Sequence, residues 1–309
     1  MNILISGTSG FIGGNVFQSL KNSYNTDSIG RSSKSHIKAD FGSTESIREL
    51  ELKAYDVFIH CAGVIDEDFK SDPKSAYQRS TYNFSLLLNK IVECKIKVVI
   101  YFSTAHVYGQ LEGIIKEDKP ANPLSDYAIA HFAAEQILQR YAKKNGIHVL
   151  IIRPMAIYGI PQSISTFKRW HLIPYSFPSE CIYNKRIVLQ TSGSQKRNFV
   201  SIKDIAAYVM TYLEQLDVFD TYTILNPIGN DTLSVYEFAI KCSDIYNKLT
   251  DSECEITRPS VSGDNKSSHF QYLTLNNFYS PDSGLDEYLE TFMRRLLKDY
   301  ENNIVYGVD

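Results

Sequence analysis

The first residues of this chain constrain its fold most strongly, because an apolar run passes directly into evenly spaced glycines. Residues 2–6 predict a buried strand, and Gly7, Gly10 and Gly13 follow at every third position. The apolar spacing of 11–22 then predicts a helix. In such a strand–turn–helix unit, backbone N–H groups at the helix N-terminus can approach a pyrophosphate. The spacing differs from the commoner Gly-x-Gly-x-x-Gly, yet its context predicts a dinucleotide-binding turn.

Strand-like and helical runs alternate through the first half of the chain. Strands are predicted at 27–30, 55–60, 97–102 and 147–152, and helices at 76–94 and 125–145. This alternation is typical of an α/β protein with a doubly wound parallel sheet. Several of these strands are apolar on consecutive residues, as expected where both faces of a sheet are covered. Ligands are therefore expected at the carboxyl ends of the strands.

The regular alternation fades after Gly159. Segment 160–186, with Pro161, Pro174 and Pro178, is expected to be an irregular insertion on the substrate side. We expect a dinucleotide-binding Rossmann domain of residues 1–159 and about 195–225, and a smaller substrate-binding domain of about 160–194 and 226–309. Other predicted elements are helices at 204–215 (with Asp204 as N-cap), 234–247 and 284–300, a strand at 221–225, and a mobile polar loop at 251–268.

Charge and cysteine usage narrow the class of protein. The 309 residues carry a formal net charge of −3, which does not indicate a nucleic-acid partner. The five cysteines are scattered and form no C-x-x-C pair, so we expect neither a disulfide framework nor a metal site, and we expect a cytoplasmic setting. No apolar run approaches the roughly 18–20 residues that cross a bilayer, so neither a signal peptide nor a membrane span is predicted.

The segment after the fourth predicted strand carries the candidate chemistry. Thr104 lies at the carboxyl edge of the sheet, and Tyr127 lies at the start of a helix from which it can point back toward Thr104. Further motifs follow in order: His60-Cys61-Ala62-Gly63, Arg153 to Gly159, and Arg197 to Asp204. As an ordered set, these motifs resemble the extended short-chain dehydrogenase/reductase family over nearly the whole chain. Members of that family include nucleotide-sugar epimerases, dehydratases and reductases.

The resemblance implies catalytic roles for three residues. Thr104 would hydrogen-bond the reacting sugar oxygen, and Tyr127 would give or take its proton while a nicotinamide exchanges hydride. His131 stands where the family has lysine, four residues after the tyrosine and on the same helix face. A histidine is mostly neutral at pH 7 and favours tyrosinate less than lysine does, although it could hydrogen-bond the nicotinamide ribose. This substitution favours reduction, in which the tyrosine acts as an acid.

The resemblance also implies residues that bind cofactor and substrate. The cofactor set is Gly7, Ser9, Gly10, Phe11, Ile12, Gly13, Arg31, Ser32, Asp40, Phe41, Cys61, Ala62, Gly63, Tyr127, His131 and Pro154. Arg31 and Ser32 end the second strand, where an NAD site usually has an acidic residue, so NADP is favoured and NAD is the alternative. Arg197 would bind the nucleotide diphosphate or is a solvated charge, and His106 is a substrate contact or a structural residue.

We therefore expect an NAD(P)H-dependent reductase that acts on a keto group of a nucleotide-activated sugar. A 4-epimerase with tightly bound NAD is one alternative. A catalytically impaired dinucleotide-binding module, serving as a sensor or interaction partner, is another. Ala105-His106 replaces the Asp-Glu pair of related dehydratases, which disfavours dehydration. The resemblance also implies a homodimer formed through helices 76–94 and 125–145.

Overall fold

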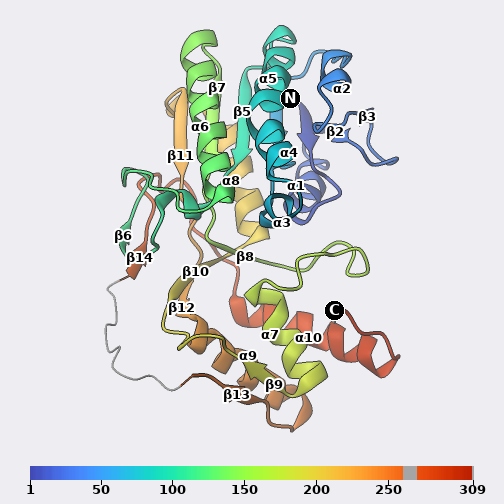
Figure 1. The fold of residues 1–309 in the computed structure, drawn as a ribbon, viewed down its shortest axis with the longest axis vertical. Helices are drawn as coiled ribbons and strands as arrows, with labels where there is room; N and C mark the ends of the chain where they lie inside the picture. The colour runs from blue at the N-terminus through green and yellow to red at the C-terminus, as the bar shows by residue number, and fades with distance from the viewer. Residues whose placement is uncertain (260–269, 308–309) are drawn as a thin grey trace.

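A seven-stranded sheet flanked by helices forms the upper part of the molecule in Figure 1. The computed structural model describes residues 1–259 and 270–307. The elements of this part are β1 (Asn2–Ser6), α1 (Phe11–Leu20), β2 (Asn25–Gly30), β3 (Ile37–Lys38), α2 (Thr44–Arg48), β4 (Val57–His60), α3 (Asp66–Ser71), α4 (Pro73–Gln78), α5 (Phe84–Glu93), β5 (Val98–Phe102), α6 (Asp126–Asn145), β7 (His148–Ile152), α8 (Ile202–Glu214) and β11 (Tyr222–Leu225). The strand order is β11-β7-β5-β4-β1-β2-β3, and every adjacent pair is parallel. The predicted doubly wound α/β fold is confirmed.

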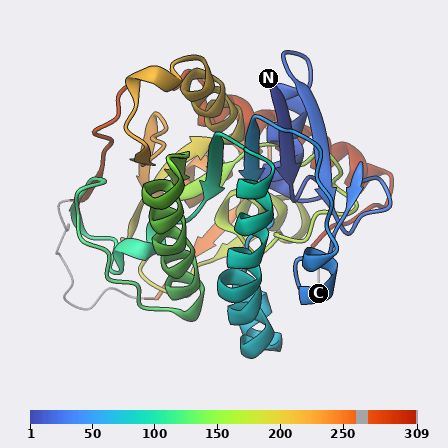
Figure 2. The ribbon, with the colours of Figure 1, turned by 90° about the horizontal axis from the view of Figure 1, so that it is seen from above.

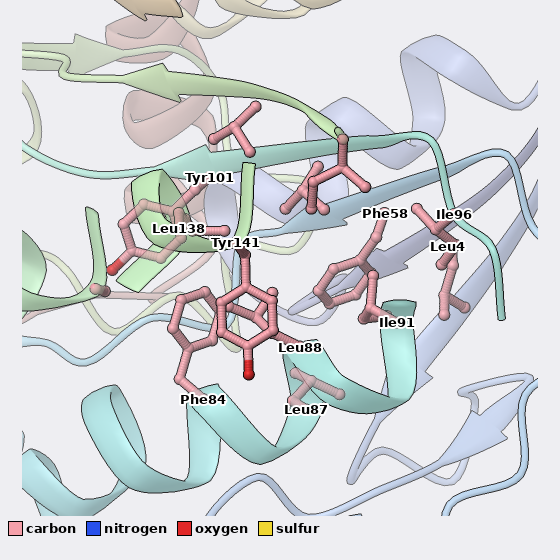
Figure 3. Packing of buried hydrophobic residues seen from close by; sticks show 14 of the residues in the cluster. Leu4, Phe58, Phe84, Leu87, Leu88, Ile91, Ile96, Tyr101, Leu138 and Tyr141 are labelled. Atoms are coloured by element: carbon pink, nitrogen blue, oxygen red, sulfur yellow. The ribbon is translucent and has the colours of Figure 1, made fainter. Parts of the chain in front are cut away.

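Helices cover both faces of this sheet. Figure 2 shows α5 and α6 side by side over one face, and Figure 3 shows the packing beneath them. There, Leu88 and Leu138 of the two helices belong to one buried cluster with Phe58 of β4. Helices α1 and α8 pack together on the opposite face. Burying a side chain of this size stabilises the fold by about 1.5–3 kcal/mol, so apolar strands covered on both faces hold the sheet together.

The lower part of the molecule has its own core and smaller sheets. Its elements are β8 (Ala156–Tyr158), α7 (Ile173–Asn184), β9 (Arg186–Val188), β10 (Lys196–Ser201), β12 (Asp231–Ser234), α9 (Val235–Thr250), β13 (Glu255–Thr257) and α10 (Leu285–Glu301). Strands β12, β10 and β8 form one sheet, and β13 pairs with β9. Between the two parts, β6 (Gly113–Ile115) pairs with β14 (Phe270–Tyr272). The core lies among α7, α9 and α10, with Phe238 and Phe292 fully buried.

The predicted helix at 76–94 differs in detail from the observed one. The helical path runs through α4, a π-helical turn at Arg79–Asn83 and α5. Asn83 of this turn is buried, and its side-chain amide donates to the carbonyls of Phe41 (2.9 Å) and Gly42 (3.1 Å). Local wide turns of this kind are rare and occur often at functional sites. Here the turn ties the helix to the segment that follows β3.

The segment predicted to be irregular contains a helix, α7, with Pro178 in its interior. Proline has no N–H to donate to the carbonyl four residues earlier, which is that of Pro174. The Tyr288 hydroxyl donates to this carbonyl instead, at 2.9 Å. A hydrogen bond from a distant helix therefore satisfies the carbonyl that the proline leaves free, and no local pattern predicts it.

The expected N-cap at Asp204 is wrong. Helix α8 begins at Ile202, and the Ser201 side chain accepts a hydrogen bond from the Lys203 amide at 3.1 Å. Asp204 is buried in the first turn, where it accepts from the Tyr279 hydroxyl at 2.8 Å. Ser201 is the cap because its backbone is still extended (φ −70°, ψ 142°), whereas Asp204 already lies inside the helix.

Two further observations concern the described residues only. None of their helices is both long enough and apolar enough to cross a bilayer. Within 1–259 and 270–307, no group of three or more histidine, cysteine or acidic side chains is placed to hold a metal ion. Residues 260–268 of the predicted mobile loop lie outside the described residues, and its earlier part contains β13.

Candidate active site

The glycine turn between β1 and α1 is tightly closed against the sheet. Gly7 has a positive φ of 72°, and its carbonyl accepts from the Gly10 amide at 2.9 Å. A Cβ on Gly13 would lie 2.4 Å from the Gly7 oxygen, so only glycine fits there. Gly10 is the N-cap and has no capping side chain, which leaves the first amides of α1 open to a ligand. Exposed Ser9 and half-buried Phe11 flank this opening.

Hydrogen bonds fix the end of β4 beside this turn. The Ser6 hydroxyl accepts from the backbone amides of Cys61 (3.1 Å) and Ala62 (3.3 Å). It also lies 2.9 Å from Nδ1 of His60, to which it can donate. Burial lowers the pKa of His60 to about 3, so this ring is a neutral structural acceptor. Ser6 was not among the predicted site residues, although it lies next to the glycine motif.

The end of β2 brings the predicted ribose-side residues together. Arg31 is exposed, with 74% of its side chain accessible, and its Nε lies 4.0 Å from a carboxylate oxygen of Asp40. The same Asp40 oxygen accepts from the Gly42 amide at 2.9 Å. The Asp40 carboxylate therefore stabilises the turn at Gly42 and also faces Arg31. Phe41 is buried next to it, and half-buried Ser32 follows Arg31 in the loop.

The proposed catalytic pair lies where β5 meets α6. Thr104 is buried two residues after the end of β5, and Tyr127 is the second residue of α6, whose N-terminus is capped by Ser125. Burial raises the pKa of Tyr127, and a hydrogen bond with the Thr104 hydroxyl partly opposes this shift. The two residues that the sequence paired are therefore adjacent. The phenol is protonated at neutral pH, which is the form that can donate a proton.

His131 is buried between two protein partners. Its side chain is 3% exposed, Nδ1 lies 2.8 Å from the Tyr101 hydroxyl, and Nε2 lies 3.2 Å from the Val64 carbonyl. Because a carbonyl only accepts, Nε2 carries the proton and Nδ1 accepts from Tyr101. Burial lowers the pKa of His131 to about 4, so the ring is neutral at pH 7. Its ring also packs edge-on against Tyr127, with centroids 4.6 Å apart.

This burial predicts a measurable pH dependence of stability. The folded-state pKa of His131 is about 4, below the ordinary 6.5, so the stability that its neutral form contributes is complete above pH 6.5. That stability is lost at about 1.4 kcal/mol per pH unit as the pH falls from 6.5 toward 4. Urea unfolding at pH 7 and pH 5 should show a smaller acid loss for His131→Gln than for wild type. Equal losses in the two proteins would contradict the assignment, and exposed His171→Gln is the control.

A cation near Tyr127 comes from a distant segment, and it was not among the predicted site residues. Arg169, in the segment before α7, lies 3.9 Å from Glu67 of α3, whose other carboxylate oxygen lies 3.2 Å from Nε2 of His171. The Arg169 charge lowers the pKa of Tyr127, whereas the Glu67 charge raises it. About 100 residues separate these partners, so no sequence pattern reveals them. Arg169 therefore brings a positive charge near Tyr127, where His131 itself is neutral.

The same segment also contacts the glycine turn. The Gln162 side chain donates to the carbonyl of Gly14 at 2.6 Å, and the Phe167 ring lies edge-on to Phe11 at 6.0 Å. Trp170 stacks on Tyr306 with ring centroids 5.6 Å apart. Segment 160–172 is therefore a strap that joins the lower part of the molecule to the start of α1.

The two predicted substrate-side residues, His106 and Arg197, lie near each other, since the Arg197 charge lowers the pKa of His106. His106 lies on a short helical turn at Ala105–Tyr108, and the Ala105 amide donates to the carbonyl of Pro154 at 2.9 Å. Arg197 of β10 is half-buried, and burial lowers its pKa. Among the described residues, no carboxylate lies within ion-pair distance of Arg197, so its charge is available to an anion.

A buried ion pair holds the strand ends beneath these residues. Arg153, directly after β7, donates to both carboxylate oxygens of Glu135 in α6, at 3.0 and 2.6 Å. The Ser103 hydroxyl, directly after β5, donates to the same carboxylate. Two-point pairing of this kind is geometrically specific. It locks α6, which carries Tyr127, against the strand end that carries Thr104.

Comparison with known proteins places this architecture in a family. Residues 3–226 match the family described as the NAD dependent epimerase/dehydratase family. The chain belongs to this family. Its relatives are sugar dehydratases and epimerases of the extended short-chain dehydrogenase/reductase type, so the resemblance seen in the sequence is confirmed. The family uses NAD in chemistry on nucleotide sugars.

Individual members of the family are distant from this chain. A dTDP-D-glucose 4,6-dehydratase of Mus musculus is 25% identical over 284 residues, which cover 82% of this chain and 75% of the relative. A GDP-6-deoxy-D-talose 4-dehydrogenase of Aggregatibacter actinomycetemcomitans is 26% identical over 247 residues, covering 79% and 80%. A solved UDP-glucose 4-epimerase of Thermotoga maritima, with UDP-glucose, has the same fold. Its TM-score is 0.78 at 19% identity, covering 97% of this chain and 100% of that one.

Proposed function

We propose that this chain is an NADPH-dependent reductase of a keto group on a nucleotide-activated sugar. The observation that carries the proposal is the state of Tyr127. Burial raises the pKa of its phenol, and neutral His131 next to it supplies no positive charge to favour the phenolate. A carbonyl that accepts hydride gains negative charge on oxygen and needs a proton donor. A protonated tyrosine therefore suits reduction of the carbonyl better than oxidation of the alcohol.

Each residue then has a defined task in the reduction. Thr104 donates a hydrogen bond to the keto oxygen and orients it toward Tyr127. Tyr127 delivers its proton to that oxygen as charge develops there, and the proton is replaced from solvent. His131 holds α6 to the loop after β4 through the Val64 carbonyl, and it keeps the Tyr127 ring in place by edge-on packing. The Arg169 charge opposes part of the rise in the pKa of the phenol.

The residues present fit a dinucleotide. A side chain on Gly13 would fill the turn, and the first amides of α1 are uncapped, so a pyrophosphate is the natural occupant of this opening. Arg31 and Ser32 would hold a 2′-phosphate, while the nearby Asp40 carboxylate is the feature that favours NAD. When bound, the nicotinamide supplies the hydride. Arg197 would bind the diphosphate of the sugar nucleotide.

Exposed side chains and free cysteines bear on the oligomeric state and the cellular setting of the protein. Ile129 of α6 and Tyr82 of the π-helical turn are exposed apolar side chains on the two helices expected to form a homodimer. We propose that these helices form a four-helix bundle with a second copy, which light scattering can measure. The five cysteines are free, which supports a reducing cytoplasm. The domain boundaries near 159, 195 and 225 stay a prediction.

One assay separates the proposed reaction from its alternatives. The protein is incubated with NADPH or NADH and, in turn, a GDP-4-keto-6-deoxyhexose, a dTDP-4-keto-6-deoxyhexose or UDP-glucose. The proposal predicts stoichiometric oxidation of NADPH with a keto sugar, and slower oxidation of NADH. Conversion of UDP-glucose to its 4-epimer with cofactor that resists dialysis would instead identify an epimerase. Tight cofactor binding without turnover of any sugar would identify a binding module.

A further inference from the structure

Three of the five free cysteines gather in the core of the lower part of the molecule. Cys181 lies in α7, Cys242 lies in α9, and Cys254 directly precedes β13, and all three belong to one buried cluster. Figure 1 shows these elements together in the lower part, where α7 packs against α9. Cys61 and Cys94 lie outside this cluster, against the cores of the upper part. The proposed reaction uses none of the three clustered thiols.

Hydrogen bonds from two neighbouring elements hold Cys254 beside Cys181. The carbonyl of Cys254 accepts from the Ser243 hydroxyl of α9 at 3.0 Å. The next amide, that of Glu255, donates to the carbonyl of Lys185 at 3.0 Å. Lys185 is the C-cap of α7 and follows Cys181 by four residues, which is about one helical turn. The Cys181 and Cys254 thiols are hydrogen-bonded to each other in this arrangement.

Cys254 is the member of the cluster whose surroundings favour the reactive thiolate. The hydrogen bond between the two thiols lowers the pKa of Cys254 and raises that of Cys181. Burial raises the pKa of Cys242. Cys254 is also 6% exposed, whereas Cys181 and Cys242 are fully buried. Because the thiolate is the nucleophile and an oxidant must reach it, Cys254 is the thiol that reacts first. Cys181 is then in contact with the oxidised sulfur.

We propose that Cys254 and Cys181 are a peroxide-sensitive dithiol that closes to a disulfide between the start of β13 and α7. The Cys254 thiolate attacks one oxygen of hydrogen peroxide, so that an S–O bond forms, the O–O bond breaks, and the leaving hydroxide takes a proton from solvent. The Cys181 sulfur then attacks the sulfur of this sulfenic acid, and water leaves as the S–S bond forms. Two electrons pass from the two thiols to one peroxide. A small dithiol can reduce the bond again.

The disulfide would close a long loop of the lower part. Residues 181–254 include α9 and also β10, the strand that carries Arg197. A cross-link between distant residues stabilises a fold mainly by restricting the unfolded chain. Oxidation should therefore make the folded protein more resistant to urea. This site lies apart from Thr104 and Tyr127, so the inference does not depend on the proposed function.

Thiol counting and peptide mapping test the site. The full-length protein is treated with one equivalent of hydrogen peroxide at neutral pH, the free thiols are alkylated, and the unreduced peptides are analysed by mass spectrometry. We expect the loss of two of the five thiols, a Cys181–Cys254 disulfide that dithiothreitol reverses, and a higher urea midpoint for the oxidised protein. Cys94→Ser, at the C-cap of α5, is the control and should form the same disulfide.

Two variants separate the roles of the paired thiols. Cys181→Ser lacks the second thiol, so Cys254 should stop at the sulfenic acid and be labelled by dimedone. Cys254→Ser lacks the first nucleophile, so Cys181 should stay reduced. Five alkylated thiols in peroxide-treated wild type, or a disulfide that contains Cys242, would overturn the assignment even if neither variant folds. None of these measurements involves NADPH, so a failure here leaves the proposed reductase untouched.

Discussion

Tyr127→Phe should lower kcat for keto-sugar reduction by about 10²–10⁴-fold, the usual contribution of a positioned general acid. The substitution removes the hydroxyl that delivers a proton to the keto oxygen, and it keeps the ring that packs against His131. The folded structure and the affinity for NADPH should therefore change little. Stopped-flow measurement of NADPH oxidation gives the rate, and fluorescence titration gives the cofactor affinity.

Tyr82→Phe is the matched control for this variant. Tyr82 lies in the π-helical turn, its side chain is exposed, and its hydroxyl accepts only a long hydrogen bond of 3.4 Å from Arg48. Its turnover should equal that of wild type. If Tyr127→Phe also retained wild-type turnover, the proton would have to come from another group, and the assignment of Tyr127 would fail.

Gly13→Ala should weaken NADPH binding about tenfold or more. The added Cβ would lie 2.4 Å from the Gly7 carbonyl oxygen and 3.0 Å from the Cys61 side chain, so either α1 or the turn must move. Overpacking of this kind costs about 1–3 kcal/mol, and each 1.4 kcal/mol lost from binding is a factor of ten in affinity. Calorimetric titration with NADPH measures the loss, and urea unfolding shows how much of it reflects global destabilisation.

Gly284→Ala provides the control for the glycine variant. Gly284 is the N-cap of α10, its φ is −92°, and no atom lies within 4 Å of an added Cβ. This variant should bind NADPH as wild type does. Unchanged affinity in Gly13→Ala would mean that the turn between β1 and α1 does not hold the cofactor.

The central sheet could be predicted from the sequence alone because the signals for its strands lie within short stretches of the chain. Consecutive apolar residues such as Val57, Phe58 and Ile59 are typical of a strand buried on both faces, and they form β4. The spacing of Gly7, Gly10 and Gly13 likewise predicted the turn that the structure contains. Periodicity and glycine spacing require no knowledge of distant partners, so these features could be read directly.

The features that the sequence did not predict depend on contacts between distant segments. Helix α7 tolerates Pro178 because Tyr288, 110 positions further along the chain, donates to the freed carbonyl of Pro174. Asp204, which was expected to cap α8, instead accepts a hydrogen bond from Tyr279, 75 positions further along the chain. No local pattern carries such information.

In the candidate site, too, some features follow from local sequence signals and others depend on contacts between distant segments. Thr104 and Tyr127 were paired from the strand end and the helix start, which are local signals. The neutral state of His131 depends on Tyr101 and on the Val64 carbonyl, which the topology brings together from other elements. The approach of Arg169 to α3 depends on the strap at 160–172. These contacts make the site differ electrostatically from one that holds a lysine at position 131.

The origin of the hydrogen on the reduced carbon distinguishes keto-sugar reduction from the alternative reactions. The protein is supplied with NADPH that carries deuterium on the transferable C4 position, together with a GDP-4-keto-6-deoxyhexose or a dTDP-4-keto-6-deoxyhexose. We expect one deuterium on the former carbonyl carbon of the sugar for each NADP⁺ formed, and loss of this transfer in Tyr127→Phe. A product without deuterium, or inversion of a sugar carbon with no net NADP⁺, would contradict it.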